Sequence, residues 1–163
     1  MADHAPERPD RASLYDEDFY AWIRHQIGLL QQRRLDSLDL DNLIEELEAV
    51  GRAEKRSVFT NMRVILQHLL QLRARTSGPA DEPETAIGAH RVYLAEDFRT
   101  SPSLRPYAID ILPECYDRAR TRAAEETGLP LSAFPADCPE SLDQVLDPGY
   151  LPGTKEGPDG DER

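Results

Sequence analysis

Residues 39–75 have the sequence DLDNLIEELEAVGRAEKRSVFTNMRVILQHLLQLRAR, in which apolar side chains recur every three or four positions. This spacing is typical of a helix that buries one face, and at 1.5 Å per residue the helix would be about 50 Å long. Gly51 lies inside the run and predicts a kink or a close helix crossing. The apolar positions are Leu43, Ile44, Leu47, Val50, Val58, Met62, Ile65, Leu66, Leu69 and Leu72.

Shorter helices are expected on both sides of this run. Apolar periodicity predicts one helix from about Ser13 to Arg34 and another over 84–99. Ser101–Pro102 is a typical helix start, and Pro113 predicts a kink or a split of the helix that follows. Gly128 has the character of a residue that ends a helix.

The C-terminal part of the chain is punctuated by proline. Residues 129–152 predict an irregular segment that wraps the bundle, with a short helix near 140–146. No segment alternates apolar and polar residues as a strand does. The sequence therefore predicts an all-α bundle of four to five helices with one long helix. We expect a disordered lead at 1–12, a single domain at 13–152 and a disordered acidic tail at 153–163.

Charge and cysteine usage limit the classes of function. The 163 residues carry a formal net charge of −12, which argues against DNA, RNA and anionic membrane surfaces as partners. Cys115 and Cys138 form no CxxC pair and are expected to be reduced thiols. The sequence shows no secretion signal and no apolar run that could span a bilayer, which predicts a cytoplasmic protein.

Two groups of short motifs resemble a known bacterial family. The first group comprises Leu43–Glu48, Gly51–Arg52 and His68–Leu70; the second comprises Ser101–Leu104, Glu126–Pro130, Phe134–Pro135 and Cys138–Pro139. Together they resemble family number twenty-nine of the domains of unknown function, over roughly Leu14 to Pro152. The resemblance implies an all-helical bundle. It supplies no activity, cofactor or catalytic residue to carry over.

Arg63 and His68 are candidate catalytic residues. Their Arg-x4-His spacing resembles that of RNases in the higher-eukaryote-and-prokaryote nucleotide-binding superfamily, where a His could act on the ribose 2′-hydroxyl and an Arg could hold the phosphate. A five-residue offset separates the two side chains by about 140° around one helix. They would converge only if a dimer brought a second copy to the same cleft.

His25, His68 and His90 are candidate metal ligands, because one falls on each of three predicted helices. The sequence has no His-Glu-x-x-His or Glu-x-x-His motif, so buried or solvated histidines are the simpler interpretation. No cofactor-binding motif is present.

The remaining candidates are surfaces for a partner protein. An acidic cluster could dock a basic partner or simply complement the helix dipole; it comprises Asp36, Asp39, Asp41, Glu45, Glu46 and Glu48. The apolar stripe widens from Ile65 to Leu72, which requires two helices of the same chain or another subunit to cover it. By elimination, the sequence favours a noncatalytic interaction or assembly module, with a homodimer as one form. A dimeric RNase and a metal-binding bundle are the alternatives.

Overall fold

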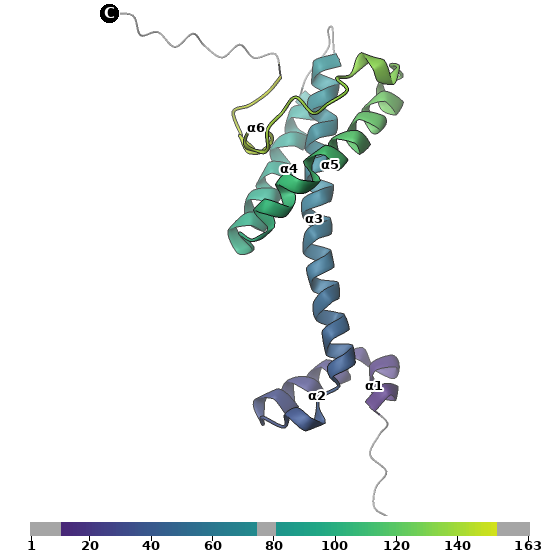
Figure 1. The fold of residues 1–163 in the computed structure, drawn as a ribbon, viewed down its shortest axis with the longest axis vertical. Coiled ribbons are helices and arrows are strands. Elements are labelled where there is room, and N and C mark those ends of the chain that lie inside the picture. The colour runs from purple at the N-terminus through teal and green to yellow at the C-terminus, as the bar shows by residue number, and fades with distance from the viewer. Residues whose placement is uncertain (1–10, 75–80, 153–163) are drawn as a thin grey trace, which may run out of the picture. The chain divides into compact units, whose positions relative to one another are not determined.

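The computed structural model describes residues 11–74 and 81–152, and over these ranges the protein is all-α, without a strand (Figure 1). The predicted fold class is confirmed. Most of the predicted lead and the whole tail, residues 1–10 and 153–163, lie outside the described residues. The helices are α1 (Arg11–Glu17), α2 (Phe19–Gln31), α3 (Leu40–Ala74), α4 (Asp81–Thr100), α5 (Leu104–Thr127) and α6 (Leu142–Leu146), with 3₁₀ turns at Leu35–Ser37 and Leu131–Ala133.

The chain divides into two compact units, and the boundary lies inside α3. The N-terminal unit ends at Gly51 and the C-terminal unit begins at Arg52. The helix α3 continues through Gly51, where an added Cβ would meet no atom within 4 Å. The close helix crossing predicted at this glycine is therefore wrong.

In the N-terminal unit, the helix predicted from Ser13 to Arg34 is interrupted at Asp18. This residue has a non-helical φ of −148°, and its side chain accepts a 2.9 Å hydrogen bond from the backbone N–H of Ala21. An aspartate is a strong N-cap, so it begins α2 rather than continuing α1. Trp22 and Tyr15 then pack edge to face across the break, with ring centroids 4.9 Å apart.

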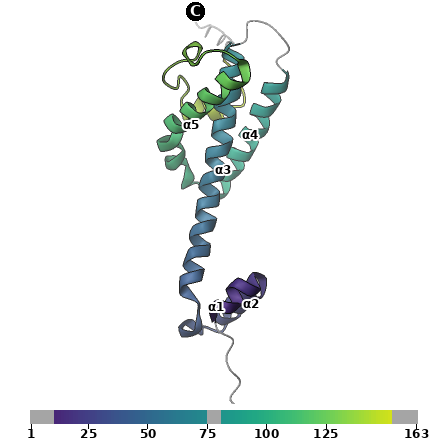
Figure 2. The same ribbon diagram turned by 90° about the vertical axis from the view of Figure 1, so that its right-hand side faces the viewer.

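The C-terminal unit is a helical bundle in which α4 and α5 lie against the C-terminal part of α3 (Figures 1 and 2). The predicted wide stripe of α3 is covered within the chain, since Ile65, Leu66 and Leu70 are all buried. The core of the bundle has other fully buried side chains from α3, α4, α5 and α6: Val58, Met62, Leu69, Ile87, Leu94, Cys115, Tyr116 and Val145.

Of the two outcomes predicted at Pro113, a kink or a split, the split is wrong. The helix α5 runs from Leu104 to Thr127 with this proline inside it. Pro113 cannot donate to the carbonyl of Ile109, but Ile109 is exposed, so water can reach that carbonyl. The helix ends as predicted at Gly128, whose φ of 71° lies in the left-handed region.

Arginines hold the irregular C-terminal segment in place. The guanidinium of Arg91 is buried and donates to three backbone carbonyls, those of Val145 (2.8 Å), Tyr150 (2.9 Å) and Gln144 (3.3 Å). Burial lowers its pKa from the ordinary value. The same segment contains the predicted short helix α6, which opens with a capping box between Ser141 and Gln144.

Candidate functional site

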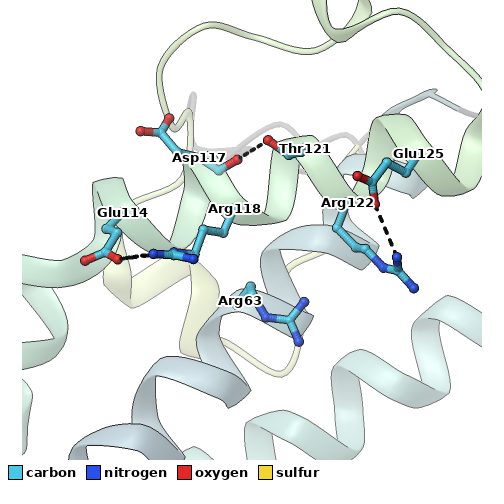
Figure 3. Close-up of a pocket in the computed structure, with 7 residues that line it drawn as sticks. All are labelled: Arg63, Glu114, Asp117, Arg118, Thr121, Arg122 and Glu125. Atoms are coloured by element: carbon cyan, nitrogen blue, oxygen red, sulfur yellow. Dashed lines mark hydrogen bonds and ion pairs between the residues drawn. The ribbon is translucent and has the colours of Figure 1, made fainter.

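The catalytic candidate Arg63 lies on α3 in the C-terminal unit, facing α5 (Figure 3). Its Nη1 donates a 3.1 Å hydrogen bond to Oε1 of Gln67, and Nε2 of Gln67 donates a 2.7 Å bond to Oε2 of Glu126. Among the described residues, no carboxylate forms an ion pair with Arg63. Its guanidinium is therefore tied to a neutral amide.

The second catalytic candidate, His68, is half-buried and engaged by a different glutamine. Its Nδ1 lies 2.8 Å from Oε1 of Gln71, and Nε2 of Gln71 donates a 2.7 Å bond to Oε2 of Glu126. Because the amide nitrogen of Gln71 is used on Glu126, its oxygen accepts the Nδ1 proton of His68. Glu126, which the sequence did not single out, therefore joins the Arg63 and His68 sides of α3.

A hollow of about 580 Å³ lies between α3 and α5, and it is lined by charged side chains (Figure 3). Arg63 lines it, whereas His68 does not. The other arginines of the hollow are paired: Arg118 with Glu114 at 3.1 Å, and Arg122 with acids of its own helix. The hollow therefore offers no convergent acid–base pair. Its lining is Arg63, Glu114, Asp117, Arg118, Thr121, Arg122 and Glu125.

His90 on α4 is a histidine whose surroundings lower its pKa. Its Nδ1 lies 2.8 Å from Oδ1 of Asn61, and its ring meets that of Tyr93 edge to face at 5.8 Å. Burial lowers the pKa of His90, and the positive charges of His68 and Arg63 lower it further. The structure thus brings Arg63, His68 and His90 into one electrostatic neighbourhood.

The three candidate metal ligands are divided between the two units. His25 is an exposed residue of the N-terminal unit, whereas His68 and His90 belong to the C-terminal unit. Over residues 11–74 and 81–152, no three His, Cys, Asp or Glu side chains gather as metal ligands do. The structure therefore does not assemble the predicted set.

Both cysteines are free thiols in surroundings that suppress their reactivity. Burial raises the pKa of the Cys115 thiol to about 12 and that of the Cys138 thiol to about 11. A nucleophilic cysteine needs a lowered pKa, so neither thiol is prepared for catalysis.

The acidic cluster is partly structural. Asp39 accepts hydrogen bonds from Nε1 of Trp22 (3.0 Å) and Nδ2 of Asn42 (2.8 Å), and Glu46 accepts one from the hydroxyl of Tyr15 (2.5 Å). That hydrogen bond, followed by burial, raises the pKa of Tyr15 to about 12. The other four acids are exposed: Asp36, Asp41, Glu45 and Glu48.

A hollow with a mainly apolar lining lies in the N-terminal unit, and the sequence analysis did not identify it as a site. This N-terminal groove has a volume of about 330 Å³ between α2 and the first turns of α3. Leu47 (71% exposed) and Val50 (60%) leave most of their side chains to solvent there. The sequence placed the same residues in a core stripe. The groove is lined by Phe19, Trp22, Ile23, Gln26, Ile27, Leu30, Leu43, Glu46, Leu47 and Val50.

The fold and these sites define an all-α protein with an open apolar groove on its N-terminal unit. Residues 14–151 match the family model described as "Domain of unknown function DUF29", and the chain belongs to this family. Comparisons with curated proteins and with solved structures give no match. Within the described part of the chain, no helix is long and apolar enough to cross a membrane.

Proposed function

We propose that this chain is a noncatalytic assembly module that holds another protein chain in its N-terminal groove. The observation that supports the proposal is the apolar lining of the groove, together with the exposure of Leu47, Val50 and Leu30. A large exposed apolar patch on a water-facing protein is typical of an interaction site.

The groove has enough apolar surface to support association. Burying one Leu, Ile or Val side chain contributes about 1.5–3 kcal/mol, and five lining residues are at least two-fifths exposed. Because each of the five is already partly buried, its further burial adds part of this amount, together with the apolar surface that the partner buries. Both act against the loss of translational and rotational freedom, which costs about 4–15 kcal/mol.

The contacts of the two candidate catalytic residues also support a noncatalytic role. Arg63 and His68 are each bonded to a glutamine, and both glutamines lead to Glu126. These contacts act within the bundle, and of the two side chains only Arg63 lines the hollow between α3 and α5. We also propose a cytoplasmic location, because the chain holds two free thiols in place of a disulfide.

A matched pair of substitutions tests the proposal. Val50→Asp places a charge in the groove, whereas Val92→Asp makes the same change at a similarly exposed valine (67%) on α4. Tagged chain is co-expressed with an untagged copy in its host, and every stoichiometric co-eluting protein is identified. We expect a co-eluting chain, either the untagged copy or another protein, with wild type and Val92→Asp, and its loss with Val50→Asp.

Two results would contradict the proposed function. One is a wild-type chain that elutes alone, without an untagged copy or any other protein. The other is a partner that Val50→Asp retains as well as wild type does. Circular dichroism of both variants shows whether each remains helical.

A further inference from the structure

Resting on the proposed function, we infer that the occupant of the N-terminal groove is the same groove of a second copy of this chain. In this arrangement α2 and the first turns of α3 from each copy form a four-helix contact around a twofold axis. Such a contact is isologous, meaning that the same patch of each copy meets its twin.

The N-terminal unit, Met1–Gly51, is small and has few buried apolar side chains. Among its described residues, the buried large apolar side chains are Trp22 and Leu29. A unit this small rarely buries enough apolar surface to be stable without a disulfide, a metal or oligomerisation. The described residues supply neither a disulfide nor a metal cluster, so association with another chain would provide the missing core.

The exposed apolar area of the N-terminal unit matches that of a dimer interface. Of the fourteen large apolar side chains that are exposed among the described residues, nine fall between Phe19 and Val50, with exposures from 40% to 72%. At roughly 100 Å² each they amount to roughly 900 Å² per copy, close to the 800 Å² that each partner contributes to a stable interface of standard size. Five of these side chains line the groove itself, and the whole helical unit of a second copy reaches more of the others than one docked peptide helix would: the five are Phe19, Ile27, Leu30, Leu47 and Val50.

The shape of the N-terminal unit is self-complementary. Leu47 at the groove and Leu40 and Ile44 beside it follow one another at intervals of three and four residues along α3, and all three are exposed. Residues spaced in this way form one ridge of a helix, and a helix ridge is what an apolar groove between two helices receives. Each copy therefore carries both a groove and a ridge that fits it.

The distribution of charge permits the contact. Residues 14–51 hold nine acids and three arginines, so two copies would repel each other if the acids met. On the helical wheel, however, Asp41, Glu45 and Glu48 of α3 lie on the face opposite Leu43, Leu47 and Val50. A groove-to-groove contact buries the apolar face and leaves these three acids in solvent. Glu46, the acid that lines the groove, accepts a hydrogen bond from the hydroxyl of Tyr15 in its own copy.

The test is the mass of the purified full-length chain in solution, measured by sedimentation equilibrium over a wide range of concentration. We expect twice the 18.4 kDa of one chain for wild type and Val92→Asp. We expect Val50→Asp to weaken dimerisation at least a hundredfold, because the twofold axis buries the new charge twice.

Three outcomes would overturn the inference or separate it from the proposed function. A wild-type chain that is monomeric throughout overturns it; if that monomer still holds a foreign protein that Val50→Asp loses, the proposed function stands. A dimer that Val50→Asp leaves intact places the contact elsewhere and overturns the inference. A larger complex that forms only with a basic peptide helix makes the acidic face the docking site and also overturns it.

Discussion

At the scale of single residues, Arg91 is the side chain on which the C-terminal segment depends most. It is 5% exposed and donates to the carbonyls of Gln144, Val145 and Tyr150, which lie 53 to 59 residues away in sequence. An arginine satisfies several acceptors with one permanent charge, which a lysine at the same place would not do.

Replacing this residue should be costly for stability. Arg91→Ala leaves three partly buried carbonyls without a donor, and we expect the free energy of unfolding to fall by about 3 kcal/mol in urea denaturation. The matched change Arg99→Ala removes a guanidinium that pairs with Glu96 at the exposed surface, where water screens the pair, and it should leave the free energy of unfolding almost unchanged. Equal losses for the two variants would show that the carbonyl contacts of Arg91 contribute little.

The two thiols predict how stability changes at high pH. An ordinary thiol titrates near pH 9, whereas burial raises the pKa of Cys115 to about 12 and that of Cys138 to about 11. The unfolded chain therefore releases these protons at lower pH than the folded chain. Their contribution to stability is complete below pH 9 and is lost as the pH rises from 9 towards 12.

We expect the urea midpoint to fall between pH 8.5 and 10, and to fall less steeply in the double variant Cys115→Ala, Cys138→Ala. Tyr15 and Tyr116, whose pKa values are raised from 10 to about 12, add to this fall as the pH approaches 10, where tyrosines of the unfolded chain begin to titrate. The double variant keeps both tyrosines, so the difference between the two curves reports the thiols. A midpoint that stays level or rises through the window would contradict the effect of burial on the two thiols.

At the scale of helices, the continuity of α3 gives a direct prediction. Gly51 is exposed inside this helix and has no neighbour that a Cβ would touch. Gly51→Ala should therefore raise the free energy of unfolding by about 0.5–1 kcal/mol, because alanine loses less backbone freedom in a helix. Thermal unfolding followed by circular dichroism checks this change, with Gly28→Ala in α2 as a second helical glycine without close neighbours. A loss of stability at Gly51 would indicate that α3 bends or opens there.

The helices could be predicted where periodicity, glycine and capping residues all indicate the same boundary. The errors arose where one residue type is compatible with two structures. The extent of α3, the end of α5 at Gly128 and the presence of α6 follow from periodicity, glycine and capping. Asp18 was missed because an acid near a helix start also complements the dipole, and only the hydrogen bond to Ala21 shows that it is a cap. At Pro113 the rule for a helix break does not hold where water replaces the lost donor.

At the scale of the whole molecule, periodicity could not show which part of an apolar stripe is covered. Leu47 and Ile65 occupy equivalent positions on the same predicted face, yet Leu47 is exposed and Ile65 is buried. The difference depends on which helices pack beside each stretch, and that is a tertiary property. The N-terminal groove and the role of Glu126 were therefore beyond prediction, because both depend on contacts between distant segments.

The protection of the two native thiols has a practical consequence for spectroscopy. At neutral pH almost none of the Cys115 or Cys138 side chain is thiolate, so thiol-specific labels should react with neither while the chain is folded. A single engineered cysteine on the surface can then be labelled without labelling the two native cysteines. A nitroxide attached to the variant Glu45→Cys, on the exposed face that the proposed contact leaves in solvent, would report its distance from a twin label by pulsed electron resonance, and a monomer would give no such distance.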